Sequence, residues 1–149
     1  MINDYCNMMF NAEKIHRLFL EVIKSELINR KIKNISNVQS LILFNMGEDE
    51  VNVGALTKGG YYQGTNVSYN LRHMVDNGYV SQQQSKDDRR SSMIRITDKG
   101  IRVVEELNDI FSKHSCYLKE NGYDEPGLSH VNNTLNGLET FLNKRIYDR

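Results

Sequence analysis

The sequence predicts a mainly α-helical chain with one β-hairpin, and three observations lead to this fold class. Apolar residues recur at helical spacing over most of the 149 residues. Two short stretches alternate polar and apolar residues as paired strands do, and a charged loop joins them. A short helix with a polar outer face comes directly before these strands. A polar-faced helix followed by a hairpin with a basic tip is the outline of a winged helix-turn-helix.

The composition is that of one globular domain. Hydrophobic residues make up 39% of the chain and charged residues 26%, with one proline, a balance that allows a buried core and argues against disorder. No apolar run approaches the ~20 residues that span a membrane. No basic region followed by an apolar stretch marks a signal peptide. We therefore expect a single domain over residues 1–149, located in the cytoplasm.

The first predicted helix covers residues 10–29, where apolar side chains recur at helical spacing. Residues 1–9 show no clear periodicity and are expected to fray or to pack late. A basic, turn-like stretch over residues 30–34 follows the helix.

Two shorter helices come next. Ser36 is the predicted N-cap of the second helix, which runs to Met46 and ends at Gly47. The third helix is predicted over residues 53–58, and a pair of glycines sets the turn after it.

The fourth predicted helix contains the candidate binding residues. Its apolar positions fall at i, i+4, i+7 and i+8, and they form one stripe made of Val67, Leu71, Met74 and Val75. The opposite face carries small polar, aromatic and basic groups, which can meet base edges or phosphates. These residues are Thr65, Asn66, Ser68, Tyr69, Arg72 and His73.

A hairpin follows this helix. Asn77-Gly78 ends the helix, because glycine tolerates the left-handed backbone of a helix C-terminus. Residues 79–84 and 92–96 are the predicted strands. The loop over residues 85–91 between them is too polar to be buried. Its cations are Lys86, Arg89 and Arg90.

Two long helices complete the chain. The first is predicted from Asp98, as N-cap, to about residue 120, and the second covers residues 128–146 after a linker rich in turn residues. Within one monomer these helices and the first have little to pack on, so an interleaved homodimer is the economical arrangement. A monomer of six helices that buries all its apolar faces is the alternative.

The formal net charge of zero hides a separation of charge along the chain. Residues 58–102 hold eight basic and four acidic residues, a net charge of +4, which leaves −4 for the rest. The positive charge is therefore concentrated where the winged helix is predicted, as a phosphate-binding face requires.

Three motifs in this region carry a family likeness: Gly78-Tyr79-Val80, Asp88-Arg89-Arg90 and Ile96-Thr97-Asp98-Lys99-Gly100. They resemble the signature of the MarR family of bacterial transcriptional regulators. Ile96 stands where that family usually has leucine.

Two further segments, residues 37–45 and 61–71, resemble an α-proteobacterial subgroup of these regulators that is linked to L,D-transpeptidase and cell-wall genes. The resemblance implies one MarR-like domain over the chain. Its winged helix would cover about residues 36–97, and helical dimerisation regions would cover about 8–34 and 98–149.

The resemblance implies a homodimeric repressor or dual regulator that places two polar-faced helices in successive major grooves of a pseudo-palindromic operator. In such grooves Arg bridges guanine, Asn bridges adenine, and Thr or Tyr meets a thymine methyl group. In the family's wing motif Asp88 braces one arginine, and an exposed arginine enters the minor groove. Arg89 and Arg90 are both candidates for that role. His73 is expected to meet a phosphate or nothing.

A small-molecule effector is the first candidate for regulation. Family members commonly hold phenolic or aromatic ligands between the dimer helices and the winged unit. By position, apolar walls and one polar anchor would form such a site, from Leu20, Ile23, Leu41, Phe44 and Asn45. The same residues are equally expected as plain core.

Oxidant sensing is the alternative form of regulation. Cys6 lies near the position where some MarR-type peroxide sensors carry a reactive thiol, but Asp4 has the wrong charge to stabilise a thiolate. Cys116 has better neighbours in His114 and Lys119. Two ordinary thiols are the simpler interpretation.

An enzyme and a protein-interaction module are the competing classes. The four histidines lie far apart without metal-ligand spacing, and the sequence has no P-loop, nucleophile elbow or glycine-rich dinucleotide turn. We therefore expect no enzymatic activity, metal or cofactor. A winged helix that binds protein without DNA often loses the basic wing, which this chain keeps.

Overall fold

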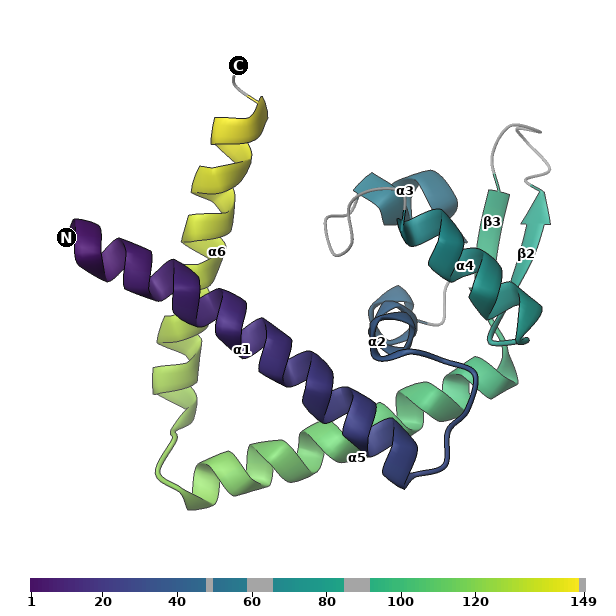
Figure 1. The fold of residues 1–149 in the computed structure, drawn as a ribbon, viewed down its shortest axis with the longest axis horizontal. Helices are drawn as coiled ribbons and strands as arrows, with labels where there is room; N and C mark the ends of the chain where they lie inside the picture. The colour runs from purple at the N-terminus through teal and green to yellow at the C-terminus, as the bar shows by residue number, and fades with distance from the viewer. Residues whose placement is uncertain (48–49, 59–65, 85–91, 148–149) are drawn as a thin grey trace. The chain divides into compact units, whose positions relative to one another are not determined.

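The structure is a computed structural model, and it describes residues 1–47, 50–58, 66–84 and 92–147. The chain divides into two compact units, Met1–Asn108 and Asp109–Arg149. Over the described residues there are six helices and a small antiparallel sheet (Figure 1), which confirms the predicted mainly α class with a winged helix. The elements are α1 (Ile2–Asn29), α2 (Asn37–Met46), β1 (Val51–Asn52), α3 (Val53–Lys58), α4 (Asn66–Asp76), β2 (Val80–Gln84), β3 (Ser92–Ile96), α5 (Asp98–Glu120) and α6 (Glu125–Tyr147).

Helix α1 begins at Ile2, so the prediction of a frayed start over residues 1–9 was wrong. The stretch has no glycine or proline to break a helix, and Asp4 lies in the first turn, where a negative charge favours the helix dipole. The carboxylate of Asp4 also pairs with the N-terminal amine at 3.2 Å. None of residues 1–9 is buried, so no apolar stripe marks this part of the helix in the sequence.

Helix α2 starts as predicted, with Ser36 as its N-cap. The Ser36 hydroxyl accepts from the Gln39 backbone N–H at 3.2 Å, and the Gln39 side-chain oxygen accepts from the Ser36 N–H at 3.0 Å. This reciprocal pair satisfies two of the free N–H groups of the first turn. Gly47, with a φ of 70°, ends the helix as expected.

The sheet contains one strand that the sequence did not show. Besides the predicted hairpin of β2 and β3, the two-residue strand β1 pairs with β3 on its other edge, with Val51 opposite Ile94. Such a short strand has no alternation to detect. Asn52, the second residue of β1, caps α3, since its side-chain oxygen accepts from the Gly54 N–H at 2.8 Å.

The junction between the hairpin and α5 depends on Thr97, not on the predicted N-cap Asp98, which lies inside the helix. The Thr97 hydroxyl accepts from the Gly100 N–H at 3.3 Å, and it lies 2.6 Å from the Gly78 carbonyl oxygen, to which it can donate. A Cβ on Gly100 would lie 2.4 Å from the Tyr79 carbonyl oxygen. Glycine is therefore needed for the helix to approach this strand so closely.

The core of the first unit draws on almost every element. It gathers apolar side chains from α1, α2, α4, the hairpin and the first turns of α5, and members with no exposed surface are Ile23, Leu43, Met74, Ile94 and Leu107. Figure 1 shows β2 and β3 beside α4. This packing holds α4 by one face only.

In the second unit, α6 begins at Glu125, three residues before the predicted start. Asp124 caps it, because its side-chain oxygen accepts from the Gly127 N–H at 2.9 Å. Pro126 is tolerated in the first turn, where its missing N–H costs nothing. Within the described ranges, no helix combines the length and the apolar content that a membrane crossing needs.

Candidate nucleic-acid interface

Helix α4 is amphipathic in the structure as the sequence predicted. Val67, Leu71 and Met74 are buried against the core. The opposite face is open to solvent and carries polar and basic side chains, with Tyr69 68% exposed. The exposed residues are Asn66, Ser68, Tyr69, Arg72 and, at the C-terminal end, the acid Asp76. Thr65 lies outside the described residues. The structure therefore brings four predicted side chains onto one accessible surface.

His73 is held against the helix that carries it. Its ring stacks on Tyr69, with centroids 6.5 Å apart and an interplanar angle of 28°. The Asn77 side-chain amide lies 3.4 Å from the ring nitrogens and donates to the His73 carbonyl at 2.9 Å. The imidazole therefore steadies the Tyr69 ring and the end of α4, and it is only half-buried.

A chain of hydrogen bonds fixes α4 to α2, and α2 to α1. The Gln39 side-chain amide is buried and donates to the Asn70 side-chain oxygen at 3.0 Å. At the other end, Asn37 donates from its side chain to the Leu20 carbonyl at 2.8 Å. Gln39 thus links the N-terminus of α2 to α4 while it completes the capping box with Ser36. Sequence patterns did not reveal this role, since the partners are distant in the chain.

The hairpin carries further polar groups on its exposed face. Ser81 pairs with Arg95 across β2 and β3, and both side chains are exposed. Gln83 is on the same face of the hairpin and is also exposed. Sequence reasoning did not select Arg95 and Gln83, although strict alternation with the buried Ile94 and Ile96 puts Arg95 on the outer face.

The predicted cations of the wing tip, Lys86, Arg89 and Arg90, and the bracing Asp88 lie outside the described residues. The other two family motifs are described, and they are structural. Gly78 takes the left-handed conformation, with a φ of 74°.

Lys99 completes the second of these motifs. Its ammonium group donates to the Asn77 carbonyl at 2.7 Å and lies 4.3 Å from the centre of the Tyr79 ring. The motifs thus join the end of α4, the wing and α5 at one corner.

The predicted effector residues are partly core. Ile23 and Leu41 are buried, and the exposed Asn45 donates from its side chain to the Leu41 carbonyl at 2.9 Å. Leu20 and Phe44 are half-buried. All five belong to α1 and α2, so the structure groups them on two adjoining helices.

The two thiols lie in different units of the chain. Cys6 on α1 and Cys116 on α5 are both free and exposed. In the described part of the chain, no group of three or more His, Cys, Asp or Glu side chains is arranged to hold a metal ion.

Comparison with known proteins agrees with this geometry. A family model described as a winged helix DNA-binding domain matches residues 35–100. The exopolysaccharide II synthesis transcriptional activator ExpG of Rhizobium meliloti is 31% identical over 127 residues, which cover 85% of this chain and 66% of ExpG. The chain therefore spans about two thirds of the length of this relative.

Two solved structures share the fold at lower identity. FabT of Streptococcus pneumoniae, solved in complex with DNA, is 23% identical with a TM-score of 0.68, and the match covers 96% of each chain. MarR of Staphylococcus aureus, solved in complex with salicylate and kanamycin, is 18% identical with a TM-score of 0.74, covering 96% of this chain and 95% of that one.

Proposed function

We propose that this chain, which has a winged-helix DNA-binding domain and the fold of the MarR regulators, is a sequence-specific transcriptional regulator of that type. The observation that carries the proposal is the exposed polar face of α4, with its buried opposite face fixed to the core. A helix presented in this way can enter the major groove of B-DNA, whose width admits one helix.

Four of the exposed side chains of α4 have a suitable partner on DNA, and the exposed acid Asp76 at the end of the helix is outside this set. Arg72 can form two hydrogen bonds with guanine, and Asn66 can form two with adenine. Tyr69 offers a ring to a thymine methyl group, and Ser68 offers a hydroxyl to a base or a phosphate. We assign minor-groove contact to Arg89 or Arg90 on the strength of the wing motif alone.

We propose further that the protein acts as a homodimer. Helices α1 and α6 each carry a row of large apolar side chains that stay in solvent, with Phe10 71% and Ile15 65% exposed on α1 and Val131 53% exposed on α6. Contiguous apolar surface of this kind marks an interaction site. A second copy of the chain would cover it and supply the second α4 that a pseudo-palindromic operator needs.

We propose a small aromatic ligand as the effector, because the MarR structure of Staphylococcus aureus contains salicylate. The half-buried Leu20 and Phe44, beside the buried Ile23 and Leu41 and the polar Asn45, offer a mostly apolar surface for a ring. Such a ligand releases DNA only if it binds the DNA-free arrangement more tightly than the DNA-bound one. Relief of repression would follow.

The target genes are proposed from the sequence motifs. The subgroup likeness of residues 37–45 and 61–71 points to cell-wall genes, among them those of L,D-transpeptidases. The relative ExpG is named as a transcriptional activator of exopolysaccharide II synthesis. Both repression and activation of the target genes are therefore to be tested for this chain.

The experiment is binding of the purified protein to the DNA upstream of its own gene, measured by fluorescence anisotropy over a series of salt concentrations. We expect tight binding with a steep salt dependence, since each phosphate contact steepens the slope by about one unit. Arg72→Ala should weaken binding, whereas Arg17→Ala, which removes an exposed arginine from α1, should not. Absence of binding at low salt to this DNA and to genomic fragments would favour a protein-interaction module instead.

A further inference from the structure

A surface pocket of about 380 Å³ lies within the first unit, on elements that the proposed DNA interface does not use. Its walls are the loop over residues 31–34 after α1, the Tyr79 side chain, and the face of α5 from Lys99 to Glu106. The pocket thus lies where the end of α1, the exit of α4 and the start of α5 meet.

The pocket is strongly cationic. Lys31, Lys33, Lys99 and Arg102 all line it. Among the described residues, no acidic side chain forms an ion pair with Lys31, Lys33 or Arg102. The Lys99 ammonium group donates a hydrogen bond to the Asn77 carbonyl at the edge of the pocket.

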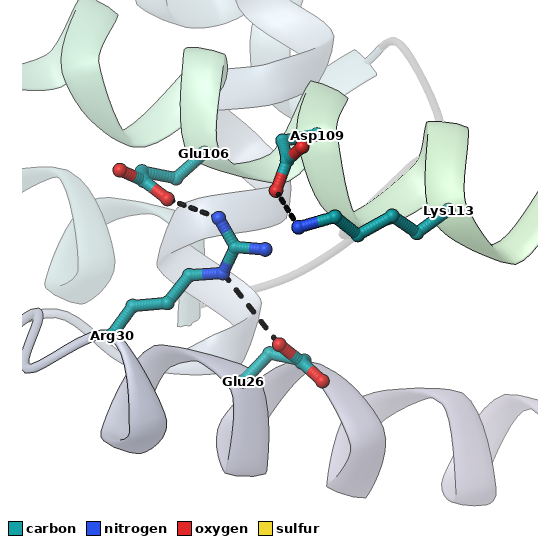
Figure 2. A network of polar contacts seen from close by, with 5 residues as sticks. All are labelled: Glu26, Arg30, Glu106, Asp109 and Lys113. Carbon is teal, nitrogen blue, oxygen red and sulfur yellow. Dashed lines mark hydrogen bonds and ion pairs between the residues drawn. The ribbon is translucent and has the colours of Figure 1, made fainter.

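Glu106 is the one acid in the lining, and its carboxylate is engaged in an ion pair. Its carboxylate pairs with Arg30, which also lies 3.6 Å from the Glu26 carboxylate (Figure 2). Because Arg30 is shared between two carboxylates, it offsets the charge of Glu106 only in part. The lining therefore holds four cations and one acid, a formal net charge of +3.

The backbone of the pocket is held in place. Lys31 and Asn34 both take the left-handed conformation, with a φ of 59°, which turns the chain sharply after α1. The Tyr79 hydroxyl, on a ring that is only 2% exposed, donates to the Lys33 carbonyl and ties the loop to the end of α4. The walls are therefore formed before any ligand arrives, which lowers the cost of binding.

We propose that this pocket binds a phosphate group. Phosphate carries the charge and the acceptor oxygens that a cluster of lysines and one arginine recognises, and arginine can bind it with two parallel hydrogen bonds. The apolar side chains of Ile32 and Val103 and the Tyr79 ring provide a wall for the rest of the molecule. The volume is suited to a small phosphorylated compound.

The same chemistry has two possible sources, a phosphomonoester of a small molecule and a phosphodiester of DNA that wraps past the winged unit. In either case the occupied site would tie α1 and α5 to the end of α4. Only DNA as the source rests on the proposed function. Binding of phosphate itself does not.

The test is a titration of the full-length protein with inorganic phosphate in the absence of DNA, at constant ionic strength, followed by ¹H–¹⁵N NMR spectra. We expect saturable shifts of the backbone N–H signals of residues 31–34 and 99–103. The double variant Lys33→Ala/Arg102→Ala should lose at least tenfold in affinity. The control Lys14→Ala/Arg17→Ala removes one lysine and one arginine from the exposed side of α1 and should bind as the wild type does.

Shifts that do not saturate in the wild type, or equal affinity in the double variant and the wild type, would overturn the proposal. Thermal unfolding of both double variants checks that they fold, and exposed side chains make a loss of fold unexpected.

A second arm distinguishes the two sources by measuring DNA binding of the same variants against salt. A slope reduced by about two units in Lys33→Ala/Arg102→Ala identifies DNA as the source. An unchanged slope identifies a small phosphorylated molecule. Since the NMR arm contains no DNA, a failure of the proposed regulator function would leave its result intact.

Discussion

Among the described glycines, Gly100 has the least room for a side chain. Its backbone passes so close to Tyr79 and Ile96 that an added methyl group would meet the Tyr79 carbonyl oxygen at 2.4 Å and the Ile96 side chain at 2.6 Å. The first of these contacts is with backbone, which cannot move aside as a flexible side chain can. The glycine of the Ile96–Gly100 motif therefore reflects packing and has no direct role in DNA contact.

Gly100→Ala should lower the free energy of unfolding by about 2–3 kcal/mol, a value typical of overpacking. Gly137→Ala is the matched control, because a Cβ at this helical glycine meets nothing within 4 Å, and it should be neutral or stabilising by up to about 1 kcal/mol. Denaturant unfolding of both variants measures the difference. Equal stabilities would contradict the close approach.

Arg72 and Asn66 are the two single residues expected to determine base preference. Each is proposed to bind one base, so replacement by alanine should cost about 1–3 kcal/mol on the preferred operator and relax the preference at one position of each half-site. Competition binding with operators that carry single base changes measures this. A uniform loss on every sequence would instead assign the side chain to phosphate.

The Tyr79 hydroxyl should make the stability of the protein depend on pH. Burial raises the pKa of its hydroxyl above the ordinary value of 10.0, so the folded protein keeps the proton to higher pH than the unfolded chain does. This contribution to stability is complete below pH 10 and is lost as the pH rises through the folded-state pKa. Tyr79→Phe should be less stable by about 1 kcal/mol at neutral pH, because the hydrogen bond to Lys33 is lost.

The same variant should lose stability less steeply than the wild type between neutral pH and about pH 11. Measuring the free energy of unfolding of both proteins across this pH range tests the direction of the predicted difference. Parallel curves for the two proteins would show that Tyr79 does not contribute to the pH dependence.

At the scale of elements, the orientation of α4 depends on a buried amide. Gln39 closes the capping box of α2 and donates to Asn70 on α4, so one side chain sets both the start of one helix and the position of the next. An unmatched buried amide is costly, which gives this contact more influence than an exposed hydrogen bond would have.

A double-mutant cycle on Gln39→Ala and Asn70→Ala should give a coupling energy of about 1 kcal/mol, as expected for neighbours that share a hydrogen bond. Gln39→Ala alone should cost more than Asn70→Ala, because it also opens the capping box with Ser36. Additive effects in the unfolding free energy would show that the contact does not couple the two helices.

Elements were predictable where a periodic pattern or a cap reveals them. The buried stripe of α4, the hairpin strands and the Ser36 cap all lie in local sequence, and the structure confirms them. The predicted start of α5 at Asp98 is confirmed, but Thr97, not Asp98, is its cap, and α6 starts three residues before the predicted residue 128. A two-residue strand such as β1 carries no pattern.

The site was predictable only in part. Residues of α4 share a face because of helical spacing alone, so their exposure followed from the sequence. The Gln39–Asn70 bond and the cationic pocket could not be found in this way, since each joins residues that are distant along the chain. The exposure of Arg95 could be predicted from the alternation of polar and apolar residues along β3 alone.

At the scale of the whole molecule, assembly should decide activity. Leu18→Asp on α1 and Leu135→Asp on α6 place a charge among exposed apolar side chains, 57% and 44% exposed respectively. If a second copy covers them, either change should yield monomers that keep their helix content and bind the operator weakly. His16→Asp, on another side of α1, is the control and should remain dimeric. Sedimentation velocity measures the outcome, and a wild-type monomer would contradict the homodimer.

The central claim is that two copies of α4 read two half-sites. Selection of bound sequences from a random DNA pool tests it most directly. We predict an inverted repeat whose half-sites are centred about 10 base pairs apart, one helical turn, with Arg72→Ala losing the preference at one base in each half. Recovery of no shared sequence, or of a single half-site without its inverted partner, would contradict the claim.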